Sequence, residues 1–102
     1  MLVLIMRIIS KKVLRDFWHK HERAKGPLEA WHAEAVKADW LTPVDIKARY
    51  KSADILKGNR VIFNIAGNHY RLVVQINYNY KIVFIRFIGT HKEYDQINAE
   101  EI

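Results

Sequence analysis

Residues 60–95 read RVIFNIAGNHYRLVVQINYNYKIVFIRFIGTHKEYD, and this stretch decides the fold. Two short turn signals separate its three apolar runs. The first is Gly67-Asn68, a dipeptide that tolerates positive φ and closes a tight hairpin; the second lies around Tyr78-Asn79. We therefore predict a three-stranded antiparallel meander that leads into a polar C-terminal turn, with strands at residues 60–66, 69–77 and 80–88.

The middle run of the meander alternates between apolar and polar residues. Its even positions are apolar, and its odd positions are polar apart from Val73. Such a period of two describes a strand with one face on a core and the other face open. The open face carries Arg71.

The third run is apolar on both faces except for Arg86, which is typical of a more central strand. Burying an unpaired charge is costly, so Arg86 must reach an acid, backbone carbonyl groups or a solvent-filled groove. We expect one face of the sheet to hold Arg71 or Arg86 in a cleft. The polar residues that follow the last strand, His91, Lys92 and Tyr94, would lie at the rim of that cleft.

The N-terminal half predicts one strand and a helical pair. An apolar run at residues 2–9 reads as a strand, and Ser10 after it is a good helix N-cap. Apolar residues at helical spacing follow from Lys11, and Gly26-Pro27 is expected to end that helix and begin a second one, to about Trp40. The tryptophans, at positions 18, 31 and 40, fit core positions.

The connection to the meander predicts one more short helix. Thr42-Pro43 opens it, and it runs to about Arg49. Residues 50–59 read as a basic connection, and residues 92–97 as a last helical turn or short strand. The chain, residues 1–102, therefore predicts a single α+β domain in which N-terminal helices pack on a small antiparallel sheet.

Composition narrows the function. The 102 residues include no cysteine, which excludes a disulfide framework, thiolate catalysis and a cysteine-based zinc site. The first apolar segment is too short to span a membrane and lacks the preceding basic residues of a signal peptide. Either Met1 or Met6 fits as the native start. We expect a cytoplasmic protein without a membrane segment.

Charge is unevenly distributed along the chain. The formal net charge is +6, residues 67–92 contain no acid, and the tail from Glu93 onward is acidic. A basic region of this kind suits a polyanionic partner, although solvated surface lysines would give the same count. Clustered carboxylates are lacking, which argues against a metal-dependent nuclease, and no cofactor motif occurs. His32-Ala33-Glu34 matches only half of the nucleobase deaminase signature.

The candidate site therefore consists of basic and aromatic residues in and around the meander. They fit either a solvated surface or metal-independent phosphodiester chemistry. Attack of a ribose 2′-hydroxyl on the adjacent phosphate needs a base, a cationic clamp and an acid for the leaving oxygen. Arginine supplies a forked clamp and histidine moves protons near neutral pH. The residues are Arg71, Arg86, His91, Lys92 and Tyr94, supported by Lys57 and Arg60.

Two motifs within the meander, RVIFNIAGNHYRLVV at residues 60–74 and IRFIGTHKEYD at residues 85–95, closely resemble the HigB family of type II toxins. These toxins are RelE-like mRNA interferases, and the resemblance runs from Met6 to the C-terminus. It implies a RelE-like α+β fold and cleavage of mRNA on the translating ribosome. It also implies neutralisation by a HigA-type helix-turn-helix antitoxin, through which alone the toxin would reach operator DNA.

The same resemblance assigns roles to the candidate residues. Arg71 matches the strand arginine of RelE-like toxins and would stabilise the transition state, and His91 would act as general acid or base. Lys92 and Tyr94 would orient the RNA or assist proton transfer. The post-strand arginines of the RelE branch are replaced here by Thr-His-Lys-Glu, so the identity of the base stays open. The RNA-binding residues would be Lys57, Arg60 and Arg86.

Two alternatives to a nuclease are consistent with the same fold. RelE-like proteins include gyrase-poisoning toxins of the ParE type, so a growth-inhibiting protein that binds DNA gyrase without cutting RNA is the first. A non-toxic member that acts only as a partner of an antitoxin or DNA is the second. The His-Lys-Glu-Tyr cluster favours the nuclease.

Overall fold

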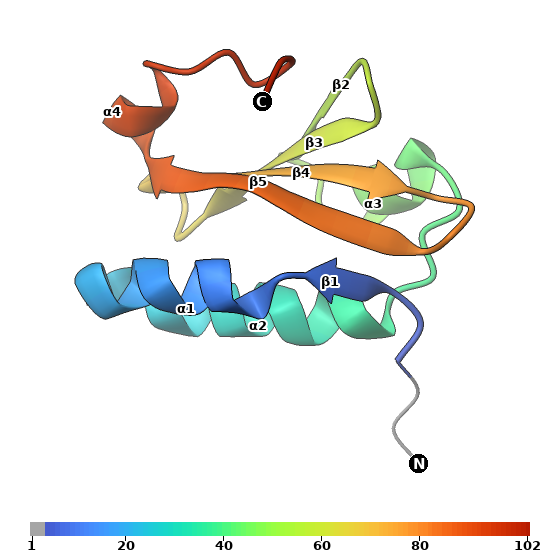
Figure 1. The fold of residues 1–102 in the computed structure, drawn as a ribbon, viewed down its shortest axis with the longest axis horizontal. Coiled ribbons are helices and arrows are strands. Elements are labelled where there is room, and N and C mark those ends of the chain that lie inside the picture. The colour runs from blue at the N-terminus through green and yellow to red at the C-terminus, as the bar shows by residue number, and fades with distance from the viewer. Residues whose placement is uncertain (1–3) are drawn as a thin grey trace.

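The structure is a computed structural model that describes residues 4–102. It has two main layers, with α1 and α2 beneath a twisted sheet and α4 with the C-terminal segment above it (Figure 1). In chain order the elements are β1 (Arg7–Ile9), α1 (Lys11–Lys20), the 3₁₀ helix η1 (Glu22–Ala24), α2 (Lys25–Lys37), α3 (Pro43–Arg49), β2 (Asp54–Leu56), β3 (Arg60–Ile65), β4 (Tyr70–Asn77), β5 (Ile82–Thr90) and α4 (His91–Tyr94).

The five strands form one mixed sheet in the order β1-β5-β4-β3-β2. The predicted meander is confirmed as β3, β4 and β5, and the α+β class is confirmed with it. The prediction of a wholly antiparallel sheet holds for β2 to β5 only, because β1 pairs with β5 in parallel. Of the strand predicted at residues 2–9, β1 occupies the last three residues, and residues 2 and 3 lie outside the described part.

Two of the departures from the sequence prediction arise where short-range contacts override the pattern. Residues 50–59 are not a plain connection: Asp54–Leu56 pairs with β3 as an antiparallel edge strand, too short to show an alternation. The last strand begins at Ile82 instead of residue 80. A four-residue turn precedes it, in which Asn77 Oδ1 accepts a hydrogen bond from the Tyr80 amide at 3.0 Å and Lys81 has a φ of 59°.

The break between the first two helices is also displaced. It lies at His21, after α1 and before η1, so the prediction that Gly26-Pro27 ends one helix and begins the next was wrong. Pro27 is the third residue of α2, in the first turn, where a backbone N–H has no helical partner to lose. No helix within residues 4–102 is long and apolar enough to cross a membrane.

The main core lies between the helices and the sheet. The three tryptophans are buried in it, as predicted, with Trp31 and Trp40 packed against the Phe63 ring of β3. Even positions of β4 face this core, which confirms the predicted alternation. Burying these large side chains supplies most of the stabilisation, at about 25 cal/mol for each Å² of apolar surface removed from water.

A second, smaller cluster lies on the opposite face of the sheet. Its buried centre joins Ile62 of β3, Val73 of β4 and Ala99 of the C-terminal segment. The segment after α4 therefore lies across the sheet face that the helices leave open. Partly buried side chains surround this centre, and they are Leu56, Phe87, Tyr94, Ile97 and Ile102.

Candidate active site

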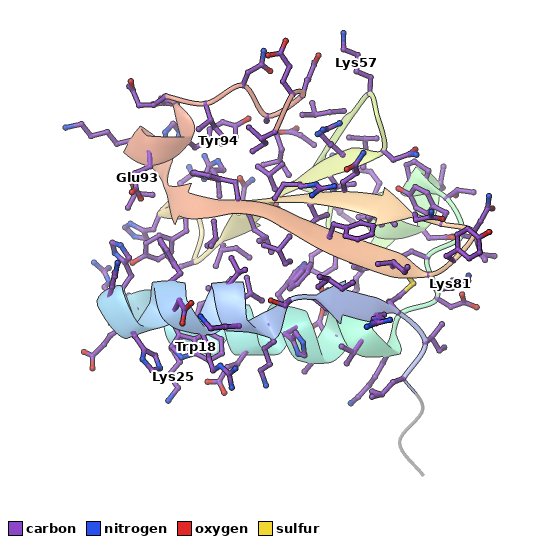
Figure 2. All side chains as sticks on the ribbon, viewed as in Figure 1. Trp18, Lys25, Lys57, Lys81, Glu93 and Tyr94 are labelled. Atoms are coloured by element: carbon purple, nitrogen blue, oxygen red, sulfur yellow. The ribbon has the colours of Figure 1, made fainter. Side chains whose placement is uncertain are left out.

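The predicted site residues lie on or beside the sheet face opposite the helices. Arg71, Gln75 and Asn77 at odd positions of β4 are partly exposed and Val73 is buried in the second cluster, whereas the even positions pack on the helical layer. Side chains from β3, β4, α4 and the C-terminal segment share the region above the sheet in Figure 2. The sheet therefore gives these functional groups one common surface.

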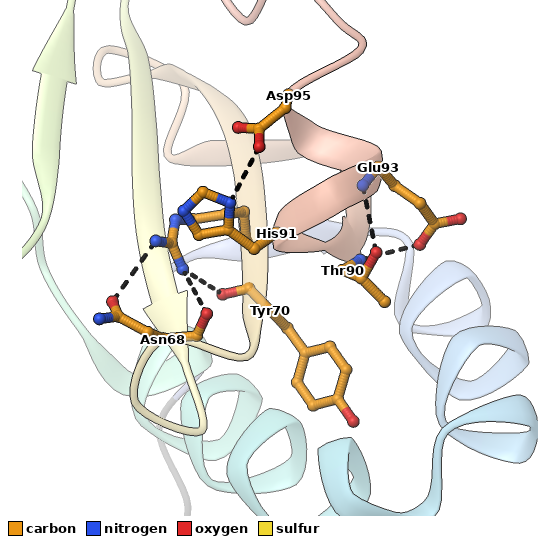
Figure 3. Close-up of polar contacts among 7 residues, drawn as sticks. Asn68, Tyr70, Thr90, His91, Glu93 and Asp95 are labelled. Carbon is orange, nitrogen blue, oxygen red and sulfur yellow. Dashed lines mark hydrogen bonds and ion pairs between the residues drawn. The ribbon is translucent and has the colours of Figure 1, made fainter.

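Arg71 keeps a positive charge that no carboxylate neutralises. Its Nη1 donates to the main-chain oxygens of Asn68 and Tyr70, both at 3.2 Å, and its Nη2 lies 3.4 Å from Asn68 Oδ1 (Figure 3). These acceptors orient the guanidinium toward the start of β4 without cancelling its charge. Within residues 4–102 Arg71 takes part in no ion pair. It is therefore available to an anion.

His91 is fixed in place through its backbone. It is the first residue of α4, and its amide donates to the His69 main-chain oxygen at 3.1 Å. The capping box around it has Thr90 Oγ1 accepting from the Glu93 amide at 3.1 Å and Glu93 Oε1 accepting from the Thr90 amide at 2.8 Å (Figure 3). The turn from strand to helix is therefore rigid.

Strand register brings His91 to the same end of the sheet as Arg71. Tyr70 pairs with Thr90, and Arg71 pairs with Gly89, so the two functional residues project from neighbouring strand ends. Gly89 lies opposite Arg71, and a Cβ there would lie 2.4 Å from the Phe87 ring, which would have to move. The structure thus brings these two predicted residues to the same end of the sheet.

The imidazole of His91 has a carboxylate partner that sequence reasoning did not identify. Its Nδ1 lies 3.3 Å from Asp95 Oδ2, and both side chains are about half exposed, at 52% and 56%. A carboxylate on Nδ1 favours the tautomer with the proton there, which leaves Nε2 to accept one. The sequence contains one indication of this contact, because residues 91 and 95 are four positions apart. That spacing places two side chains on the same face of a helix.

Tyr94 is held as a neutral phenol. Its ring lies 6.4 Å from the Phe87 ring, within the second cluster. Burial raises its pKa, the negative charges of Asp54 and Asp95 act in the same direction, and the positive charge of Arg71 opposes them. Its hydroxyl therefore keeps its proton through neutral pH and can donate a hydrogen bond.

Lys92 lies beside His91 at the start of α4. It is the second residue of α4 and is exposed. Within residues 4–102 its side chain makes no hydrogen bond or ion pair. We define the α4 end of the face as Arg71, His91, Lys92 and Tyr94.

The second predicted group lies near the β2–β3 hairpin. Two of its cations are occupied by the C-terminal segment: Lys57 Nζ lies 3.2 Å from Glu100 Oε2, and Arg60 donates from Nε and Nη2 to the main-chain oxygen of Ile102 at 2.9 and 2.6 Å. RNA that binds here must displace these contacts. We define the hairpin end as Lys57, Arg60 and Arg86.

Arg86 is not buried, so it does not need the acid or backbone carbonyl groups that the sequence prediction gave it as partners. Val73 pairs with Phe87 while Val74 pairs with Ile85, so Arg86 is the extra residue of a β-bulge and is exposed. Its Nε and Nη2 donate to Gln75 Oε1 at 3.1 and 2.7 Å. Its charge is therefore not neutralised.

The structure thus divides the seven predicted residues between two ends of one face. Sequence reasoning missed the residues that orient them, Asn68, Gln75 and Asp95. Within residues 4–102 no group of three or more histidine, aspartate or glutamate side chains is arranged to hold a metal ion. The α4 end combines an oriented histidine, a free guanidinium and a neutral phenol, a set suited to proton transfer beside a phosphate.

Comparison with known proteins gives a consistent result. The family model described as HigB_toxin, RelE-like toxic component of a toxin-antitoxin system, matches residues 24–97. The mRNA interferase toxin HigB of Escherichia coli (strain K12) is 32% identical over 96 residues, with 92% of each chain covered. The mRNA interferase HigB of Escherichia coli O6:H1 is 26% identical over 94 residues, covering 90% of this chain and 91% of that one.

Proposed function

Since this chain belongs to the HigB family of RelE-like toxins of toxin–antitoxin systems, we propose that it is an mRNA interferase, an endoribonuclease that inhibits translation. The curated relatives support the activity through their names, and they match nearly the whole chain. The observation that carries the proposal is the α4 end of the sheet face, where Arg71 has no acidic partner and His91 is oriented by Asp95.

The reaction follows from the chemistry of these groups. Nε2 of His91 takes the proton of a ribose 2′-hydroxyl, whose oxygen attacks the adjacent phosphorus. Arg71 stabilises the extra negative charge on the phosphorane-like transition state. The bond from phosphorus to the 5′-oxygen breaks, and that oxygen receives a proton from Tyr94 or Lys92. The products are a 2′,3′-cyclic phosphate and a free 5′-hydroxyl, so atoms and charge balance without an added cofactor.

In this proposal the ribosome positions the RNA strand, because the exposed site does not hold it firmly by itself. The side chain of His91 is about half exposed, and Lys92 is exposed, so water has access and a free RNA strand is only weakly constrained. Proximity and alignment account for much of the rate of such reactions. Translated mRNA held on the ribosome would arrive already extended, which supports a ribosome-dependent activity in the cytoplasm.

The proposed regulatory partner is a HigA-type helix-turn-helix antitoxin. Family membership establishes that the chain is the toxic component of a toxin–antitoxin system, which requires a neutralising partner. The toxin would then bind operator DNA only by way of that antitoxin. Co-purification with the product of a neighbouring reading frame would identify it.

Primer extension on an mRNA incubated with ribosomes and the protein tests the proposal. We expect cuts within codons that require the ribosome and disappear in His91→Ala. The matched control is His19→Ala, the same change at an exposed histidine of α1, which should cut like the parent. Intact mRNA from a protein that still arrests growth would refute the nuclease, and inhibition of DNA supercoiling would then point to gyrase.

A further inference from the structure

A cleft at the hairpin end of the sheet face has no role in the reaction proposed above. Its volume is about 430 Å³, within the range of small-molecule sites. It lies where β4 ends and turns into β5, beside the residue that precedes β3. Four of its lining residues carry side-chain amides and two carry aromatic rings. The lining residues are Asn59, Gln75, Ile76, Asn77, Tyr78, Asn79 and Phe84. We refer to it as the amide cleft.

The sheet register places the amide cleft beside the arginines of the hairpin end. Gln75 pairs across the strands with Arg60 on one side and with Phe84 on the other. Gln75 also holds Arg86, whose guanidinium lies 5.2 Å from the centre of the Phe84 ring. The cleft itself has a neutral lining. It thus has cations at its rim but none in its lining.

Some of the amides in the cleft have unused hydrogen-bonding capacity. Both polar atoms of the Gln75 side chain already have partners. Its Oε1 accepts from Arg86, and its Nε2 donates to the Gly58 main-chain oxygen at 3.3 Å. Asn77 uses only its Oδ1, for the Tyr80 amide, so its Nδ2 remains a free donor. Within residues 4–102 the side chains of Asn59 and Asn79 make no hydrogen bond.

We infer that the amide cleft binds a nucleobase of the RNA next to the position that is cut. Single-stranded RNA is recognised when a base stacks on an aromatic ring or guanidinium and its edge meets hydrogen-bonding side chains. Phe84 and Arg86 supply the stacking surface, and Asn77 with Asn59 supplies donors and acceptors. A phosphate would need cations within the cleft, whereas here the cations lie outside it, where the backbone of the same nucleotide would pass.

The distance to the α4 end makes this a flanking position. Gln75 follows Arg71 by four residues on β4, which corresponds to about 13 Å at ~3.3 Å per residue. The nucleotide that is attacked at Arg71 cannot also reach the cleft over this distance, but a neighbouring nucleotide of the same RNA can. The inference rests on the proposed ribonuclease function and adds to it a subsite that selects the cut position by base.

Sequencing of all cut sites in a pool of mRNAs, with ribosomes, tests the inference. Asn77→Asp keeps the Oδ1 that accepts from the Tyr80 amide and replaces the free donor by an acceptor. Phe84→Leu removes the ring but keeps an apolar side chain. Both variants should lose the base preference at one position flanking the cut, and cleavage at the preferred sites should fall by roughly 5- to 100-fold.

The matched control is Asn98→Asp, which adds the same charge in a turn where Oδ1 likewise accepts a main-chain amide, that of Glu100 at 3.1 Å. It should keep the parental preference. If Asn77→Asp and Phe84→Leu both cut with the parental preference and rate, the cleft is not a base subsite although the nuclease stands. If the parent itself cuts no RNA, the proposed function fails and this inference with it. Should Phe84→Leu not fold, Asn77→Asp decides alone.

Discussion

The two ends of the open sheet face both carry cations, but they differ in what already binds them. At the α4 end Arg71 contacts only the neutral oxygens of Asn68 and Tyr70. At the hairpin end Lys57 is paired with Glu100, and Arg60 holds the main-chain oxygen of Ile102. Charge counted along the sequence treats these cations alike, whereas in the structure the C-terminal segment contacts Lys57 and Arg60, and within residues 4–102 only Lys57 of these cations is paired with a carboxylate.

The largest effect is expected at the histidine of the α4 end. His91→Ala should lower the single-turnover rate of mRNA cleavage by about 10²–10⁴, the usual contribution of a general acid or base. Asp95→Asn should cost less, because the ring stays while its orientation weakens. A rate for His91→Ala within threefold of the parent would remove His91 from the mechanism.

The second largest effect is expected when an arginine of the α4 end is compared with an arginine of the hairpin end. Arg71→Ala should lower the cleavage rate by about 10²–10³, because it removes the clamp on the transition state. Arg60→Ala, the same chemical change at a cation that the C-terminal segment already holds, should lower it by less than about tenfold. Equal losses in the two variants would mean that the ends do not differ in function. Thermal unfolding of each variant serves as the folding control.

A smaller effect is expected for the phenol at the α4 end. Tyr94→Phe should lower the rate by about tenfold, as Lys92 can still protonate the leaving oxygen. Burial raises the pKa of Tyr94 above its ordinary value, so the phenol is neutral throughout the pH range in which cleavage would be measured. The pH–rate profile between pH 5 and 9 should therefore have the same shape in both proteins. A limb near pH 8 that vanishes in Tyr94→Phe would contradict this.

The smallest effect is expected on RNA affinity, when one cation of the hairpin end loses its acidic partner. Glu100→Gln removes the carboxylate that pairs with Lys57, so Lys57 becomes available to RNA. Affinity for single-stranded RNA should rise by at most about fivefold, because exposed ion pairs are weak. The gain should shrink as salt is added. Fluorescence anisotropy would measure the RNA affinity in a His91→Ala background, which does not cut the RNA. A weaker affinity in Glu100→Gln would show that the C-terminal segment supports RNA binding.

Much of the fold could be predicted because its signals are local. Alternation over residues 69–77 and the Gly67-Asn68 turn predict the hairpin of β3 and β4. The pairing of β4 with β5 then brings Arg71 and His91 to one end. The positions of the tryptophans followed from helical periodicity in the same way. Where a signal was weak or ambiguous the prediction was wrong, as for the helix break at Gly26-Pro27 and the short strand β2.

The rest could not be predicted because it depends on partners far apart in sequence. The contact of Arg60 with Ile102 joins residues 42 positions apart, and the parallel pairing of β1 with β5 spans most of the chain. No local pattern reports such contacts. The sequence therefore indicated which residue types a ribonuclease site needs, but not which cations already have a partner within the chain.

The parallel pairing of β1 with β5 also bears on how this toxin is made. Synthesis produces β1 among the first elements, yet Arg7 finds its partner only when Ile82 has been made. Contacts of such long range form late and slowly. The same final strand carries Gly89 and leads into His91, so neither the sheet nor the site exists on a half-finished chain. A ribosome translating this message is thus not exposed to a folded toxin until the chain is almost complete.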